Sequence, residues 1–384
     1  GCTGIKQLVE HGFEIQAVFT HNDDPGENLW FSSVAETAVA HGLQVYAPEN
    51  INHPIWVEKI RELQPDIIFS FYYRNMVGQE VLDIPKHGCL NLHGSLLPKY
   101  RGRCPVNWVI INGEEETGVS LHYMVVQPDA GDVVGQLPVT IDDADSALDL
   151  HAKLNDASRE LLKSCLPSIR NNDVQKLPQD HTASSYFGGR TPADGEIDWQ
   201  QSGTSVRNLV RAVTRPYPGA FTYLGNRKCF FWQVQTVAGM VNKKPGTVLS
   251  IDPLVINCLH DAVQVEIGQS EGGPLIGGAQ LAEEMNIAPN MVFGPRKDLV
   301  RELKRKKHIL ILGVNGFIGN HLSEKLLASE RYVVHGMDLA TDSISRFLEH
   351  PDFFFSEGDI SIHREWIEHH VKKCDIVPVS YTHL

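Results

Sequence analysis

The stretch CLNLHGSLLPKYRGR, from Cys89 to Arg103, joins an apolar run to a polar loop that contains Gly and Pro. The apolar residues predict a buried strand. Asn91 and His93 stand two apart on it, so their side chains leave the same face near its carboxyl end. Ligands bind at that end of the strands in open α/β sheets. An amide donor beside a titratable imidazole suits acyl transfer, in which an oxyanion is stabilised and a proton is moved. A strand end with a hydrogen-bonded histidine is the alternative.

Size and composition indicate a protein of several domains. At roughly 150 residues per domain, 384 residues suggest two or three. The net charge of −13 disfavours a nucleic-acid partner, because phosphate binding needs a clustered positive surface. No apolar run reaches the roughly 20 residues of a membrane helix, and the first residues lack a signal-peptide pattern, so we expect a cytoplasmic protein. No set of His, Cys and acidic residues has metal-ligand spacing, so no metal is expected.

Residues 1–178 predict an α/β domain of the Rossmann type. Apolar strands alternate with segments of helix length, which indicates a parallel sheet with helices on both faces. The chain begins with a helix, Gly4 to His11, whereas such a domain normally opens with a strand. We therefore expect that the first strand is absent. Two strands joined by the turn QPDAG, and an amphipathic stretch from Ser146 to Arg170, complete the domain.

Two polar segments separate the remaining domains. Residues 179–195 are expected to be a linker over the surface, and 196–293 a small β domain, since short strands alternate there with Pro and Gly. This domain resembles a barrel of the OB type. Residues 294–305 are expected to be a basic linker. They hold most of the run RKDLVRELKRKK, from Arg296 to Lys307, which we interpret as a solvated connection, with a nucleic-acid patch as the alternative.

Residues 306–384 predict the first half of a second Rossmann domain. The segment HILILGVNGFIGNHLSEKLL is expected to form a strand, a glycine turn and a helix. Gly313, Gly316 and Gly319 lie in the turn. Such glycines let the backbone approach a pyrophosphate at the helix amino end. Asp338 ends the next strand, where an acid hydrogen-bonds the adenosine ribose and favours NAD over NADP. The alternative is a glycine turn that packs helix on strand without a ligand. We expect the closing VSYTHL to be a cut or artefactual end.

The segments NLHGSLLPKYRGRCPVNWVIINGE, TGVSLHYM and PDAGD resemble the folate-dependent formyltransferase family. The resemblance runs from about Gly1 to Phe293, because IDW and VRAVTRPYPGAFT resemble the family's carboxyl domain. YRGRCPVNW favours the branch that contains methionyl-tRNA and sugar-nucleotide enzymes. The resemblance implies a catalytic trio of Asn91, His93 and Asp129. It also implies 10-formyltetrahydrofolate as donor, bound at Asn75, Met76, Val77, Arg103, Val125, Val126, Gln127, Pro128 and Asp129.

The tail from about Arg305 resembles the extended short-chain dehydrogenase and epimerase family. That family's catalytic Tyr and Lys have no counterpart in these 384 residues, so the second activity is expected to be incomplete. The resemblance implies NAD contacts at Gly313, Gly316, Phe317, Ile318, Gly319, Asp338, Asp359 and Ile360.

A chain with both modules in this order resembles the bifunctional enzymes that modify lipid A and confer polymyxin resistance, and this resemblance implies a hexamer. Its formyl acceptor would be the 4-amine of UDP-4-amino-4-deoxy-L-arabinose, and its second module would oxidatively decarboxylate UDP-glucuronate with NAD. Two alternatives remain open, a methionyl-tRNA formyltransferase and a catalytically silent folate-binding or scaffold module. The excess of acidic over basic residues disfavours the tRNA enzyme, and the presence of all three trio residues disfavours the silent module.

Overall fold

A computed structural model describes residues 1–21, 32–239, 242–296, 306–359 and 363–377. The chain folds into two compact units. The first comprises Gly1–Gly195, Gln201–Ala220 and Phe231–Val237, and the second comprises Glu196–Gln200, Phe221–Phe230 and Ala238–Leu384. No described helix is both long and apolar enough to span a bilayer.

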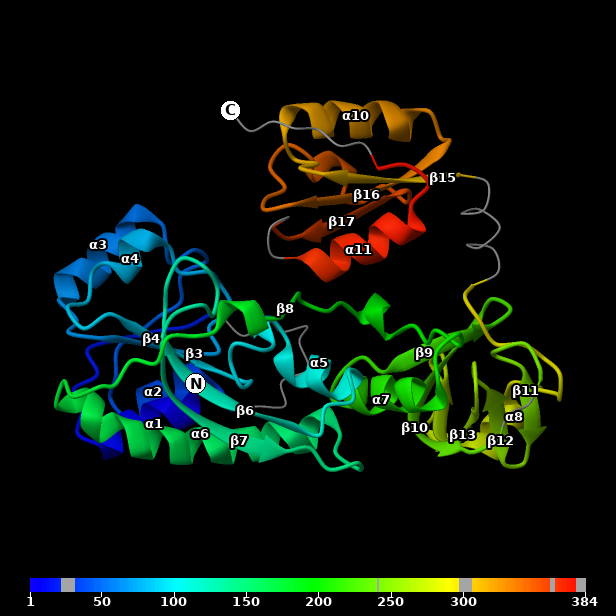
Figure 1. Cartoon of the computed structure of the whole chain (residues 1–384), viewed down its shortest axis with the longest axis horizontal. Helices are drawn as coiled ribbons and strands as arrows, with labels where there is room; N and C mark the ends of the chain where they lie inside the picture. The colour runs from blue at the N-terminus through cyan, green and yellow to red at the C-terminus, as the bar shows by residue number, and fades with distance from the viewer. Residues whose placement is uncertain (22–31, 240–241, 297–305, 360–362, 378–384) are drawn as a thin grey trace. The chain divides into compact units, whose positions relative to one another are not determined.

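The first unit is a sheet between two layers of helices (Figure 1). In that view α1 and α6 lie on one side of the sheet, and α3 and α4 lie on the other. Its helices are α1 (Cys2–Glu10), α2 (Val34–Ala40), α3 (Pro54–Leu63), α4 (Gln79–Leu82), α5 (Pro105–Ile111), α6 (Ala147–Arg170) and α7 (Gly203–Val213). Its strands are β1 (Val18–Phe19), β2 (Val45–Tyr46), β3 (Ile68–Phe71), β4 (Cys89–His93), β5 (Arg101–Gly102), β6 (Glu116–Tyr123), β7 (Val133–Thr140) and β8 (Tyr186–Phe187).

The sheet is mixed, with the order β3-β4-β6-β7. β3 and β4 are parallel, whereas β6 and β7 form the antiparallel hairpin expected around QPDAG. β1 and β2 form a separate parallel pair. A cavity of about 1630 Å³, lined by β1, β3 and α1 among others, lies beside both pieces. The apolar residues of β3 are consequently only half-buried. The absence of a first strand stays a prediction.

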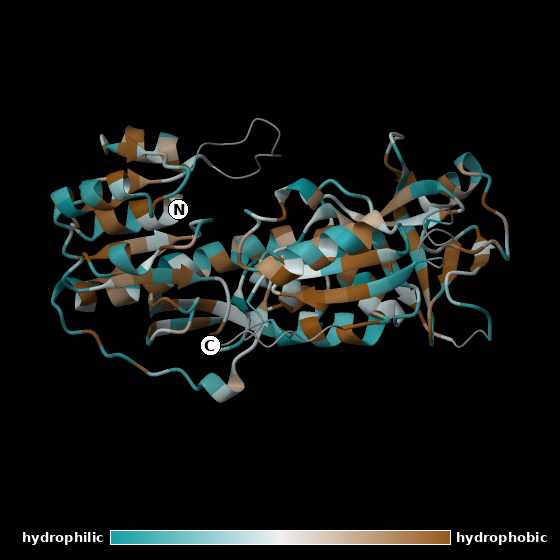
Figure 2. Ribbon diagram, turned by 90° about the horizontal axis from the view of Figure 1, so that it is seen from above, coloured by the Kyte–Doolittle hydropathy of each residue, from teal (hydrophilic) through white to brown (hydrophobic). Residues whose placement is uncertain are grey.

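α6 illustrates how sequence determines the packing. Ser146 and Asp149 form a reciprocal capping box that satisfies backbone N–H groups at the start of the helix. From there Leu150, Leu154 and Leu161 recur at helical spacing and are buried. This face packs against β6, β7 and α1, and it fixes the sheet that carries β4. Figure 2 shows the same amphipathic character as alternating brown and teal along the helices.

The predicted β domain is a six-stranded sheet with the path β11-β12-β13-β10-β9, to which β14 adds by pairing with β13. Residues beyond β14 bridge both ends of this path, since Gly294 pairs with Tyr223 of β9 and Val292 pairs with Thr247 just before β11. The sheet is therefore closed as a barrel, as expected. Its elements are β9 (Ala220–Leu224), β10 (Arg227–Val237), β11 (Val248–Ile251), β12 (Leu254–Asn257), β13 (Ala262–Ser270), β14 (Ile276–Gly277) and α8 (Gly278–Glu284).

The tail forms a three-stranded parallel sheet with the order β15-β16-β17. In Figure 1 α10 and α11 lie on opposite faces of it. Its elements are β15 (Lys307–Leu312), α10 (Phe317–Ala328), β16 (Tyr332–Asp338), β17 (Phe353–Glu357) and α11 (Arg364–Lys373). The α/β fold class with two Rossmann-like domains and a β domain is confirmed. The basic run and the closing VSYTHL lie almost entirely outside the described residues.

Candidate active site

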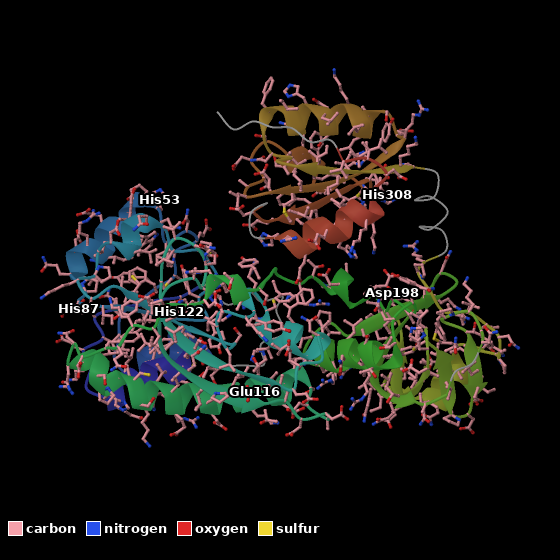
Figure 3. The ribbon with its side chains drawn as sticks, in the orientation of Figure 1. His53, His87, Glu116, His122, Asp198 and His308 are labelled. Carbon is pink, nitrogen blue, oxygen red and sulfur yellow. The ribbon has the colours of Figure 1, made fainter. Side chains whose placement is uncertain are left out.

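β4 brings the first two members of the predicted trio together. Its apolar residues Cys89, Leu90 and Leu92 are buried, and Asn91 is half-buried. β6 lies antiparallel beside it, with His122 directly opposite Asn91 and Ser120 opposite His93. Figure 3 labels His122 among the strands of the first unit. Side chains directly opposite on paired strands lie about 5 Å apart, so His122 belongs to this cluster by register alone.

Asp129, in the loop after β6, completes the trio. Its carboxylate lies 3.6 Å from Nδ1 of His93 and 3.4 Å from both Nε2 of His122 and Nδ2 of Asn91. The N–H of Gly102 donates to its other oxygen at 2.8 Å. Burial alone would raise the pKa of Asp129, but the two imidazoles and this N–H outweigh burial and hold the pKa well below its ordinary value. Asp129 is therefore a carboxylate at neutral pH.

His93 is held by a backbone contact that determines which of its nitrogens carries hydrogen. Nε2 lies 2.7 Å from the carbonyl oxygen of Tyr100. A carbonyl only accepts, so Nε2 carries the hydrogen and donates it. Nδ1 is consequently the nitrogen that can take up or release a proton, and it faces Asp129. A proton on Nδ1 would be stabilised by this carboxylate.

His122 determines the orientation of the Asn91 amide. Its Nδ1 lies 2.8 Å from the carbonyl oxygen of Tyr123 and so donates to it. Nε2 lies 3.2 Å from Nδ2 of Asn91 and 3.4 Å from the carboxylate of Asp129, so it accepts from the amide when the ring is neutral and donates to the carboxylate when the ring is protonated. The second amide hydrogen faces Asp129 at 3.4 Å, longer than an ordinary hydrogen bond. Because this contact is weak, the amide can turn this hydrogen away from the carboxylate toward a ligand oxygen.

The segment expected to be a surface linker contributes to the site. β8 pairs in parallel with β5 of the loop that follows His93, and Phe187 stacks on Tyr100 with ring centroids 4.8 Å apart. Gly102 has a φ of +95°, and a Cβ there would lie 2.3 Å from the carbonyl oxygen of Phe187. Only glycine fits this approach. Gln179, also from this segment, is buried beside Arg101.

The residues implied in folate binding lie in two loops and next to β5. Asn75, Met76 and Val77 follow β3, and residues 125–128 precede Asp129. Met76, Val125 and Val126 are large apolar side chains that are exposed. Arg103 is exposed and directly follows Gly102. Exposed apolar side chains beside polar groups suit a flat aromatic ligand.

The glycine turn of the tail has the geometry of a dinucleotide site. Gly313 has a φ of +78° and open space around its Cα, and Gly316 precedes α10 without a side-chain cap. A Cβ on Gly319 would lie 2.3 Å from the carbonyl oxygen of Gly313. Phe317 and Ile318 are exposed at the start of the helix. The residues thus leave backbone N–H groups at the helix start accessible to an anion.

Asp338 ends β16 beside this turn. Its two carboxylate oxygens accept from the backbone N–H groups of Asn315 and Leu339, at 2.8 and 2.7 Å. The carboxylate is thereby fixed, and each oxygen retains a lone pair for a ribose hydroxyl. Asp359 lies just beyond β17, whereas Ile360 falls outside the described residues.

Family models match three consecutive parts of the chain. The model described as Formyl transferase matches residues 5–166, and the model described as Formyl transferase, C-terminal domain, matches residues 190–286. The protein is a formyltransferase. The model of the NAD dependent epimerase/dehydratase family matches residues 309–379, so this formyltransferase carries a second, NAD-dependent domain.

Solved structures share the fold of the formyltransferase part. WlaRD, a sugar 3N-formyl transferase solved in the presence of dTDP and 5-N-formyl-THF, is 20% identical with a TM-score of 0.53, over 69% of this chain and 93% of that one. The N-formyltransferase from Helicobacter canadensis, solved with folinic acid and dTDP-3-aminofucose, is 20% identical with a TM-score of 0.54, over 69% of this chain and 94% of that one.

Three residues of this formyltransferase that contact the trio or its loops escaped the sequence analysis. His122 would have been found only from the strand register, which the sequence does not give. Arg101 and Gln179 stand 78 positions apart and meet only in the folded chain. A polar segment such as 179–195 gives no signal that one of its side chains is buried.

Proposed function

We propose that Asn91, His93 and Asp129 transfer a formyl group from 10-formyltetrahydrofolate to the 4-amine of UDP-4-amino-4-deoxy-L-arabinose. The observation that carries this proposal is the convergence of an amide and an imidazole, both from β4, on one carboxylate, at 3.4 Å for Asn91 and 3.6 Å for His93. An amide donor and a proton carrier are what the transfer of an acyl group to an amine requires.

The donor supplies an activated formyl carbon, and residues of the chain stabilise the developing charge and move the proton. As the amine nitrogen bonds to this carbon, Asn91 donates an amide hydrogen to the developing oxyanion. His93 accepts the amine proton at Nδ1, where Asp129 stabilises the imidazolium. The bond between the carbon and the folate nitrogen then breaks, and His93 returns the proton to that nitrogen. Atoms and charge balance without a metal ion.

The donor assignment rests on the surroundings of the trio. We assign the pterin to the exposed apolar side chains of Met76, Val125 and Val126, with Asn75, Val77, Arg103 and residues 127–129 completing the donor site. Two structures with the same fold were solved with folinic acid or 5-N-formyl-THF, which supports a reduced folate here.

The acceptor assignment rests on the fused domain and on charge. An NAD-dependent epimerase/dehydratase domain acts on nucleotide sugars by family resemblance. One structural relative is a sugar 3N-formyl transferase, and the other is an N-formyltransferase solved with dTDP-3-aminofucose. A net charge of −13 suits a small diphosphate better than a tRNA. Arg103 is exposed next to Gly102 and borders the donor site, so it is also a candidate for contacts with the acceptor near the reacting centre.

For the tail we propose NAD as the cofactor, held by the turn at Gly313, Gly316 and Gly319 and by Asp338 and Asp359. The left-handed Gly313 and the close approach at Gly319 fit this cofactor. By resemblance, the whole enzyme joins both steps on UDP-sugars in the cytoplasm, as a hexamer, in the lipid A modification that gives polymyxin resistance.

The deciding experiment offers 10-formyltetrahydrofolate with either acceptor to the purified protein. We expect formylation of UDP-4-amino-4-deoxy-L-arabinose, with a KM that changes less than about threefold over moderate salt. Charged initiator tRNA should remain unmodified. A comparable kcat/KM on methionyl-tRNA would refute the acceptor assignment, while leaving the trio in place. No transfer to any amine would refute the formyl-transfer proposal itself.

A further inference from the structure

Gln179 uses all of its hydrogen-bonding capacity between two parts of the active site. Its Nε2 donates to the carbonyl oxygens of Asp129 and Gly131, at 2.8 and 2.6 Å. Its Oε1 accepts from Nε and Nη2 of Arg101, at 3.2 and 2.6 Å. The side chain is buried, with 8% exposure. A buried amide with every donor and acceptor satisfied holds its partners in a single arrangement.

Arg101 anchors this arrangement from the other side. The residue is only 4% exposed, and burial lowers the pKa of its guanidinium, an effect that the nearby Asp129 carboxylate opposes. Nη2 also donates to Nδ1 of His181, at 3.1 Å. Arg101 belongs to β5, whose next residue, Gly102, donates to Asp129. The guanidinium therefore ties Gln179 to the strand that holds the Asp129 carboxylate.

The backbone of Asp129 has an uncommon conformation that its neighbours hold in place. Its φ of +52° is in the left-handed region, which is uncommon for residues other than glycine, although aspartate adopts it more readily than most. Such a conformation persists only when its surroundings impose it. Gln179 donates hydrogen bonds to the carbonyl oxygen of this residue and to the carbonyl oxygen two positions later. It therefore holds the turn from outside.

We propose that Gln179 is a positioning residue for formyl transfer: by bridging Arg101 and the Asp129–Gly131 turn, it holds the Asp129 carboxylate against His93 and His122. The proposal rests on the proposed function of the trio. It makes the segment that follows α6 a part of the active site. Gln179 touches no reacting atom and acts through Asp129.

The test compares three variants of the whole chain. Gln179→Leu removes all four hydrogen bonds at similar volume. Gln179→Glu keeps an acceptor for Arg101 but turns a carboxylate oxygen toward two carbonyl oxygens. Gln175→Leu, at an exposed position of the same segment, is the matched control. We expect kcat to fall about 10- to 100-fold in both Gln179 variants with the donor's KM within about threefold, since a misplacement of roughly 1 Å has effects of this size. Gln175→Leu should match the wild type.

Folding is followed separately by thermal unfolding. Gln179→Glu retains a pairing with Arg101, so its unfolding midpoint should exceed that of Gln179→Leu while its kcat is equally low. A purely structural role predicts the opposite pattern, in which kcat per folded molecule is unchanged and only the midpoint falls. That pattern would overturn the proposal.

A second readout does not depend on any acceptor. With ¹³C-labelled aspartate, the carboxyl resonance assigned to Asp129 by its loss in Asp129→Asn should titrate below the ordinary range in the wild type. In Gln179→Leu its midpoint should move up toward that range. If the wild type transfers no formyl group and this shift still occurs, the proposed function fails and the positioning role stands. An unchanged midpoint in Gln179→Leu would refute the positioning role.

Discussion

The trio site of the first unit and the glycine turn of the tail are built from different materials. At the trio, buried side chains hold one another, with His122 orienting Asn91 and the Gly102 N–H fixing Asp129. At the turn, the backbone itself is the binding surface, and the decisive feature is the absence of side chains at Gly313, Gly316 and Gly319. A site made by side chains should lose activity when any side chain of its network is replaced. A site made by backbone should lose binding when a side chain is added at one of its glycines.

Asn91→Ala provides the largest expected effect and tests the side-chain site directly. We expect kcat to fall about 10²- to 10³-fold, the usual loss when one oxyanion donor is removed. The fold should survive, since Asn91 is only half-buried on β4. Steady-state kinetics with the amino-sugar acceptor measures the loss of kcat. Asn171→Ala, an exposed residue after α6, is the control. A kcat near the wild-type value would show that the converging side chains are not the reacting site.

Asp338→Ala tests the backbone site at the carboxylate that ends β16. A hydrogen bond to a charged group contributes about 1.5–3 kcal/mol, so NAD should bind roughly 10- to 100-fold more weakly. Discrimination against NADP should disappear with the carboxylate. Calorimetric titration with each dinucleotide measures both, with the exposed Asp342→Ala as control. A wild-type preference for NADP would mean that Asp338 has been misinterpreted.

His122→Phe tests whether one side chain of the trio's network matters by itself, because it keeps the ring volume and removes only the contacts of the imidazole. Asn91 and Asp129 then both lose the ring nitrogen that lies 3.2 Å from the amide and 3.4 Å from the carboxylate. We expect kcat to fall about tenfold, with the KM of the donor little changed. Kinetics and a thermal unfolding curve separate this loss from instability. An equal rise in KM would instead indicate that His122 shapes the donor site.

Asp129→Asn tests the electrostatics of the trio through stability. The pKa of Asp129 is depressed in the folded protein, so its carboxylate stabilises the fold above its unfolded pKa of about 3.9. This contribution is lost as the pH falls below that value toward the folded pKa. The wild type should therefore lose more stability than Asp129→Asn between about pH 5 and 2. Urea unfolding across this range measures the difference, and parallel curves would contradict the depressed pKa.

The same contrast explains what the sequence could predict. The turn at Gly313 was predictable because a backbone site needs particular residues at fixed spacing between a strand and a helix. Asn91 and His93 were predictable from a strand's alternation. Gln179 was not, because the identity of a buried partner depends on which loops meet. The 11-residue strand β10 was not predicted either, because polar residues interrupt its apolar pattern within a closed barrel.

Closure of the barrel by Val292 and Gly294 has a consequence for synthesis on the ribosome. These residues come last in the barrel's sequence, yet they bridge its two edges, and Phe293 between them is among the largest fully buried side chains. Domains generally fold in order as they emerge, at about 5–20 residues per second. The barrel must therefore wait with two open edges until translation has passed Gly294. A pause there would leave those edges available to a neighbouring nascent chain.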